Sequence, residues 1–192
     1  MPKVVPEYKE KAKERILGAA FEEFSEKGYY EARMEDIAER LGVSKRTLYL
    51  YYKNKEELFK AMSAQAPKIV AGMLRQCLAG RDAGRACADF FDISTKEPPS
   101  GLSFEIIAVA SRNPELRKAE RDAIEETLEI ISKFIQGMGR KGGPSEAEAH
   151  QKAMIVLALY RGLMADLVLG AKKSDVREAW TRATDILIRG SS

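Results

Sequence analysis

The sequence predicts an all-α protein with a small N-terminal helical domain and a larger helical domain after it. Along nearly every segment, apolar residues recur at intervals of three and four, the spacing of one face of an α-helix. No run alternates apolar and polar residues as a half-buried strand does. Because 45% of the 192 residues are hydrophobic, the chain has enough apolar material for packed cores.

The first predicted helix covers about residues 7–27. Its apolar face carries Ile16, Ala19, Ala20 and Phe24. The helix is expected to end at Gly28, because glycine readily adopts the left-handed conformation that closes many helices.

Glycine and proline residues separate the remaining helices. After two short helices within 34–52, we expect helices at about 55–66, between the connections 80–84 and 97–101, and at 115–138, 145–170 and 174–188. Pro67 either interrupts the helix over 55–66 or starts the next one. A glycine-rich loop at 139–144 precedes the last two helices.

The segment from Met34 to Tyr52 has the spacing of a helix-turn-helix. Ala38 is small enough for a second helix to approach closely, and Leu48 points inward from that second helix. Gly42 suits the tight turn between them, and Ser44 can cap the second helix. In such a motif the second helix enters the major groove of DNA.

Local charge supports a DNA-binding surface, although the net charge of +3 from 32 basic and 29 acidic residues is too small to do so. No acidic residue lies between Glu39 and Glu56, a stretch that holds five cations. Lys45 and Arg46 are the candidates for reading bases. The full set of DNA-binding candidates is Arg33, Ser44, Lys45, Arg46, Thr47, Tyr49, Leu50, Tyr51 and Lys55. The alternative is an ordinary helical hairpin with a solvated basic face.

These residues resemble the TetR family of transcriptional regulators between about Ile16 and Phe59. The landmarks are Ala20-Phe21, Phe24, Gly28-Tyr29, Asp36-Ile37-Ala38, Gly42-Val43-Ser44, Thr47-Leu48-Tyr49, Tyr51-Tyr52 and Lys55-Glu56-Glu57-Leu58-Phe59. Two positions depart from the family pattern. Arg33 stands where the family usually has a capping threonine, and Arg46 where it often has glycine.

The resemblance implies a three-helix DNA-binding domain over residues 1–54 and an effector-binding and dimerisation domain over 55–192. It also implies a homodimer formed by the last two helices. A two-fold dimer places two reading helices about one turn of DNA apart, which suits a near-palindromic operator. Some relatives of this kind respond to fatty acyl-coenzyme A, which makes that class a candidate effector.

Residues 153–169 are almost wholly apolar, which allows a membrane-spanning interpretation. Arg161 and Asp166 near the middle argue against it, so we expect a buried helix instead. The last helix, with Val176, Trp180 and Ile186 at helical spacing, is expected to complete the dimer surface.

Aromatic and methionine side chains in the second domain are candidates for lining an effector pocket. The candidates are Met73, Leu74, Phe90, Phe91, Phe104, Ile107, Ile131, Ile135 and Met154, with Glu105 and Arg161 as polar groups that orient a ligand or form an ion pair. The alternative for each apolar residue is a place in the ordinary core.

The sequence thus favours a ligand-responsive repressor that an apolar or amphipathic effector releases from its operator. A transcriptional activator and a ligand-independent architectural DNA-binding protein are the alternatives. We expect no enzyme activity, cofactor or metal site, because the single histidine, His150, lies in no catalytic motif and the two cysteines lack zinc-ligand spacing. Cys77 and Cys87 are expected to be buried thiols. The N-terminus shows no signal peptide, so a cytoplasmic location is expected.

Overall fold

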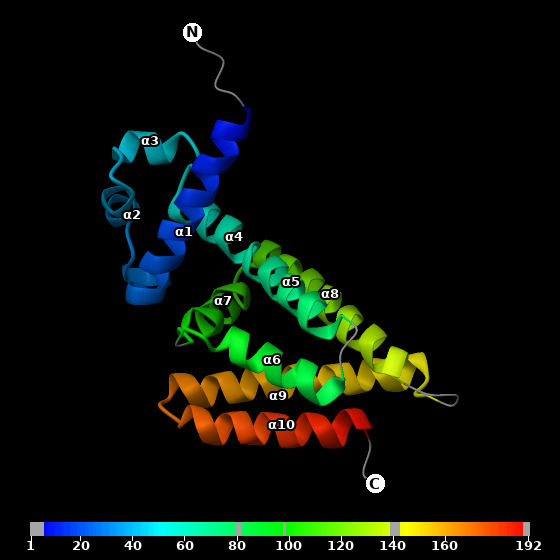
Figure 1. Cartoon of the computed structure of the whole chain (residues 1–192). Coiled ribbons are helices and arrows are strands. Elements are labelled where there is room, and N and C mark those ends of the chain that lie inside the picture. Colours follow the sequence, from blue (N-terminus) through cyan, green and yellow to red (C-terminus); the bar gives the residue numbers. More distant parts are fainter. Residues whose placement is uncertain (1–5, 80–81, 98, 139–142, 190–192) are drawn as a thin grey trace. The chain divides into compact units, whose positions relative to one another are not determined.

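The computed structural model describes residues 6–79, 82–97, 99–138 and 143–189, and within these ranges it is all-helical, as predicted (Figure 1). The helices are α1 (Pro6–Glu31), α2 (Met34–Leu41), α3 (Lys45–Tyr49), α4 (Lys55–Ser63), α5 (Ala66–Leu78), α6 (Ala83–Ser94), α7 (Leu102–Ala110), α8 (Pro114–Met138), α9 (Glu146–Val168) and α10 (Lys173–Arg189). Among the described helices, none is long and apolar enough to cross a membrane.

The chain forms two compact units. The first consists of residues 1–66 and 101–118, and the second of residues 67–100 and 119–192. The chain passes from the first unit to the second at Pro67, which lies in the first turn of α5, so this proline starts a helix rather than interrupting one. This division describes packing. The functional division at residue 54 stays a prediction.

The first unit packs α1, α2, α3, α4 and α7 around one apolar core. Phe24 of α1 and Phe59 of α4 are fully buried, and their rings meet edge to face with centroids 5.1 Å apart. Leu48 of α3 is equally buried and belongs to the same core. The predicted inward face of the first helix is confirmed, since Ile16, Ala19 and Ala20 are buried there.

Gly28 interrupts α1, as the sequence predicts, but with a different conformation. Its φ of 76° is positive, whereas its ψ of 167° lies outside the left-handed helical region. The chain then forms one further turn that ends at Glu31. Gly28 therefore redirects the chain instead of capping the helix in the expected way.

Ion pairs hold α1 against α2. The Arg40 guanidinium of α2 contacts carboxylates of Glu22, Glu23 and Glu26 on α1. Glu23 is nearly inaccessible to solvent, and two cations, Arg40 and Lys27, form ion pairs with its carboxylate. The partners of Arg40 lie at least 14 residues away in the chain.

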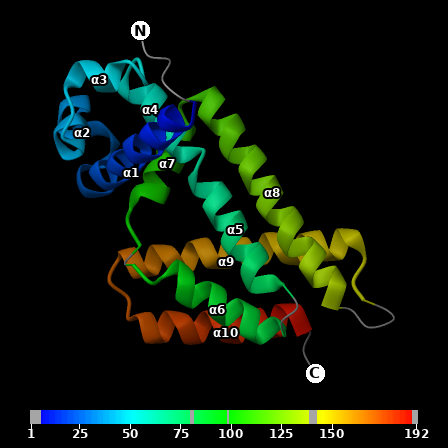
Figure 2. The same ribbon diagram turned by 45° about the horizontal axis from the view of Figure 1, so that its top comes forward.

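In the second unit, α9 and α10 run side by side in both views (Figures 1 and 2) and α6 packs on α10. Trp180 of α10 is buried, and its indole Nε1–H donates to the Cys87 carbonyl oxygen of α6 at 2.8 Å. Val176 is buried on the same side of α10. Trp180 and Val176 therefore belong to the core of their own subunit, and their expected place on the dimer surface was wrong.

Candidate DNA-binding surface and effector cavity

Residues 34–52 form a helix-turn-helix with the predicted turn and cap. Gly42 ends α2 in the left-handed conformation, with φ 68° and ψ 30°. The Ser44 hydroxyl accepts a hydrogen bond from the Thr47 backbone N–H at 3.1 Å and so caps α3. Ala38 and Leu48 are buried between the two helices. The helix-turn-helix that the sequence pattern predicts is therefore confirmed.

The outer side of α3 presents two cations and two large side chains. Lys45, Arg46, Tyr49 and Leu50 are all exposed, and Leu50 is exposed to 76%. The Lys45 ammonium lies 5.7 Å from the centre of the Tyr49 ring and forms an ion pair with Glu35. That carboxylate raises the pKa of Lys45. Arg46 has no ion pair with any residue that the structure describes.

The other candidates border this helix. Arg33 precedes α2 and is exposed, and its side chain makes no capping hydrogen bond, as expected from its departure from the family pattern. The Thr47 hydroxyl lies 2.8 Å from that of Ser44. Tyr51 is half-buried and packs against the core of the first unit.

The structure gives Lys55 a role different from the predicted phosphate contact. Its ammonium donates to the carbonyl oxygens of Tyr29, Tyr30 and Ala32 at 2.6, 3.0 and 3.0 Å. An ammonium has three N–H donors, so this one has none left for a phosphate. Burial lowers the pKa of Lys55. We therefore remove Lys55 from the DNA-binding candidates.

Lys53 lies two residues earlier and keeps an exposed side chain. Its backbone N–H donates to the Glu57 carboxylate at 2.8 Å, and its ammonium has no ion pair within the described part of the chain. The Asn54 side chain accepts a hydrogen bond from the Glu57 backbone N–H at 2.8 Å and so caps α4.

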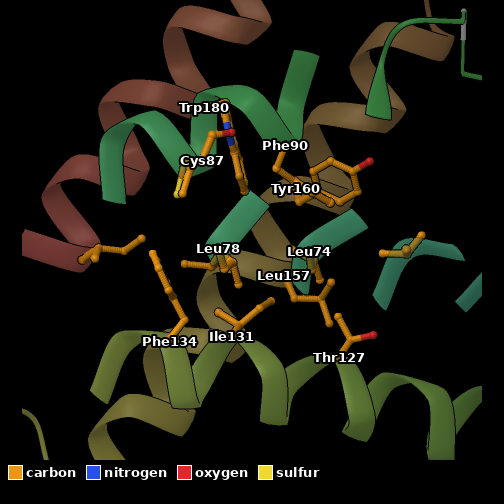
Figure 3. Close-up of a pocket in the computed structure, with 14 residues that line it drawn as sticks. Leu74, Leu78, Cys87, Phe90, Thr127, Ile131, Phe134, Leu157, Tyr160 and Trp180 are labelled. Carbon is orange, nitrogen blue, oxygen red and sulfur yellow. The ribbon is translucent and has the colours of Figure 1, made fainter. Parts of the chain in front are cut away.

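A cavity in the second unit has an empty volume of about 530 Å³, part of which opens to solvent. Side chains from α5, α6, α8, α9 and α10 converge on it, as Figure 3 shows. Its lining is Val70, Leu74, Leu78, Ala86, Cys87, Phe90, Thr127, Ile131, Phe134, Val156, Leu157, Tyr160, Trp180 and Ile188.

The polar side-chain groups that line this cavity have partners within the protein. The Thr127 hydroxyl donates to the Ala123 carbonyl oxygen, and the Trp180 indole donates to that of Cys87. Burial raises the pKa of the Tyr160 hydroxyl, and the neighbouring Ser94 side chain acts in the opposite direction. Burial raises the pKa of Cys87 to about 11, so this residue is a neutral thiol at neutral pH. The cavity therefore offers an apolar surface to an occupant.

Comparison with known proteins assigns the motif to a family. The family model of bacterial regulatory proteins of the tetR family matches residues 16–62, which hold the helix-turn-helix described above. The chain belongs to the TetR family. It is a DNA-binding transcriptional regulator, and its relatives are regulators rather than enzymes.

Relatives of the regulator match well beyond this segment. The regulator is 27% identical over 156 residues to the HTH-type transcriptional regulator UidR of Escherichia coli, with 80% of each chain covered. It is 32% identical over 151 residues to the transcriptional activator FasR of Mycolicibacterium smegmatis, covering 76% of this chain and 65% of FasR. The structure of FadR from Bacillus subtilis in complex with stearoyl-CoA has the same fold, with a TM-score of 0.67, 19% identity and coverage of 93% and 99%.

The cavity of the regulator contains only part of the predicted ligand-binding set. Leu74, Phe90 and Ile131 line it. Phe91 and Ile135 are buried in the surrounding core, and Met73 packs against that core. Met154 is 52% exposed and lies outside the cavity.

Three predicted ligand residues, Phe104, Glu105 and Ile107, belong to α7 and to the first unit. Ile107 is 52% exposed, and the Glu105 carboxylate accepts a hydrogen bond from the Tyr29 backbone N–H. None of the three lines the cavity. Their sequence neighbourhood suggested a pocket because it is apolar, but α7 packs on α1 instead.

Most of the lining residues were not predicted, among them Leu157, Tyr160 and Trp180. The sequence of α9 did indicate that part of the lining comes from this helix, because a helix that is apolar all round is buried on more than one side.

Arg161 lies next to Tyr160 and interacts electrostatically with Glu120. Desolvation lowers the pKa of Arg161 and raises that of Glu120, although Arg161 keeps an exposed surface. No hydrogen bond joins these two described side chains.

Proposed function

We propose that the regulator represses transcription from a near-palindromic operator and that an amphipathic effector with a hydrocarbon chain releases it. The observation that carries this proposal is the cavity, whose lining is apolar and whose polar side chains are already hydrogen-bonded. A polar ligand placed there would lose hydrogen bonds to water without replacement, at a cost of about 1–3 kcal/mol for each group. A hydrocarbon chain has no such cost and gains burial.

Fatty acyl-coenzyme A is the effector class that we propose. The FadR structure, which shares the fold, contains stearoyl-CoA. An acyl chain suits the apolar cavity. Arg161, with Glu120 beside it as its electrostatic partner, is the proposed group for orienting the polar end.

On the DNA side, we propose that α3 enters the major groove. Lys45 and Arg46 read base edges there, and Leu50 makes an apolar contact. Phosphates are contacted by Arg33, Ser44, Thr47, Tyr49 and Tyr51, together with Lys53 in place of Lys55. These cations come from a surface on which Arg46 and Lys53 have no internal ion pair among the described residues.

We propose that α9 and α10 form the dimer interface. Met154 and Ile155 of α9, Leu169 at its end and Ile186 of α10 are large apolar side chains that are at least half exposed in the single chain. Burying such residues against a second copy is favourable by about 25 cal/mol per Å². An Ile155→Asp variant should be monomeric in light scattering and bind operator weakly, while Asp175→Ala, on the same helix pair, serves as the control.

Activation of transcription is the alternative to the proposed repression. FasR, at 32% identity, is named an activator. A reporter gene placed behind the operator distinguishes the two, since deletion of the regulator raises expression under repression and lowers it under activation.

Titration of the regulator with stearoyl-CoA tests the effector proposal, with coenzyme A as the control that lacks the chain. The operator duplex is first selected from a random library by the wild-type protein. Stearoyl-CoA should weaken operator binding about 5- to 150-fold, and operator should weaken stearoyl-CoA binding by the same factor. Binding of stearoyl-CoA without any change in operator affinity would support the architectural alternative. Mass spectrometry of copurifying molecules identifies an effector of another class.

A further inference from the structure

Two charged side chains from distant parts of the chain converge on residues 28–32, the segment between the regular part of α1 and α2, which we call the α1–α2 joint. Glu105 of α7 accepts a hydrogen bond from the Tyr29 backbone N–H, with N and Oε2 2.6 Å apart. Lys55 of α4 donates to three carbonyl oxygens of the same segment. The joint thus has an anion bound to its N–H side and a cation bound to its C=O side.

Gly28 makes the approach of Glu105 possible. Its φ of 76° and ψ of 167° belong to a region of backbone conformation that is essentially restricted to glycine. A Cβ atom at this position would lie only 2.5 Å from Glu105 Oε1. The missing side chain therefore leaves the space that the carboxylate occupies.

Packing reinforces both bonds. The Tyr29 ring lies 4.5 Å from the Phe59 ring, and the Lys55 ammonium lies 4.8 Å from the centre of the Tyr29 ring. Hydrogen bonds to charged groups are stronger than those between neutral groups. The joint is accordingly fixed by α4 from one side and by α7 from the other.

We propose that Glu105 is a positioning residue for DNA binding that acts through the α1–α2 joint. The joint leads directly to Arg33, which precedes the first turn of α2. Helix α2 packs against α3, and Ala38 and Leu48 are both buried in the core that these helices share. A displaced Tyr29 peptide shifts the start of α2 and hence the reading helix. The proposal rests on the assignment of α3 as that helix.

Operator and random-sequence duplexes separate positioning from general stability. The operator is the duplex that wild-type protein selects from a random library, and binding is measured by fluorescence anisotropy at one salt concentration. Glu105→Ala should weaken operator binding about tenfold, the scale of one hydrogen bond to a charged group. Binding to random DNA should stay unchanged, because phosphate contacts tolerate a misplaced helix better than base contacts do.

Three further variants define the chemistry. Glu105→Gln keeps a neutral acceptor and should lose less operator affinity than Glu105→Ala. Ser103→Ala changes an exposed residue of the same helix and should behave as wild type. Gly28→Ala should cost more operator affinity in the wild-type background than in Glu105→Ala, since its methyl group displaces a carboxylate only where one is present.

Hydrogen exchange of the Tyr29 amide reports directly on the bond and needs no DNA. The amide should be protected in wild type and exchange faster in Glu105→Ala. Loss of this protection with an unchanged ratio of operator to random affinity would overturn the proposal, and so would equal loss on both duplexes in step with a lower melting temperature. If the proposed function is wrong, the wild-type protein selects no duplex from the library. The role of Glu105 can still be tested in that case, because unchanged exchange of the Tyr29 amide in Glu105→Ala refutes it.

Discussion

The helix-turn-helix and the effector cavity differ in how far apart their residues lie in the chain. The turn, the cap and the reading helix all lie between Met34 and Tyr52, so neighbours three to six positions away fix their conformation. The cavity brings together five helices whose lining residues range from Val70 to Ile188. Roles set by local spacing can therefore be predicted from sequence, whereas roles set by long-range packing cannot.

The largest expected effect tests whether long-range ion pairs hold the DNA-binding unit together. Arg40→Met should lower the stability of the fold by about 3 kcal/mol, because it removes one of the two cations, Arg40 and Lys27, that form ion pairs with the buried Glu23 carboxylate. Thermal unfolding measures the loss. Arg46→Met, at a position with no internal ion pair among the described residues, is the matched control. Equal melting temperatures for the two variants would mean that Arg40 faces solvent as a surface cation does.

The next effect tests the locally determined reading helix. Arg46→Ala and Lys45→Ala should each reduce the preference for operator over random DNA by about 1–3 kcal/mol, the scale of a good base contact. Competition binding with the two duplexes gives this ratio. An unchanged ratio in both variants would remove the base-reading assignment.

A smaller effect is expected when the cavity is filled. Ile131→Phe adds volume to a residue that lines the cavity and should weaken stearoyl-CoA binding about tenfold, at about 1–3 kcal/mol in overpacking. The variant should retain operator binding. Ile107→Phe makes the same change on the exposed side of α7 and should leave effector affinity alone. A larger loss in Ile107→Phe than in Ile131→Phe would place the effector outside this cavity.

Particular residues show where the limit of sequence reasoning lies. Gly42 and Ser44 act within their own turn, and both roles were predicted. Glu105 and Lys55 were assigned to ligand and DNA from their neighbours in sequence. Their partners lie 76 and 23 to 26 residues away, in the α1–α2 joint.

The cavity illustrates the same limit. Leu74, Phe90 and Ile131 were predicted because they are apolar residues on helices of the second domain. That criterion selected Ile107 and Met154 equally, although both are half exposed. Periodicity identifies the apolar face of a helix but does not tell which helix covers that face. Trp180, which stands on the last helix, was placed at the dimer surface for this reason.

Lys53 and Lys55 allow the most direct test of the central claim, that contacts rather than charge identify the DNA-binding cations. They lie two residues apart, and only Lys55 is bound to backbone carbonyl oxygens. The measurement is the slope of log K against log salt for operator binding by Lys53→Met and Lys55→Met. The slope is negative, and its absolute value should fall by about 1 in Lys53→Met, which loses a phosphate contact. In Lys55→Met the slope should stay at the wild-type value. A slope that falls in Lys55→Met and not in Lys53→Met would contradict the account.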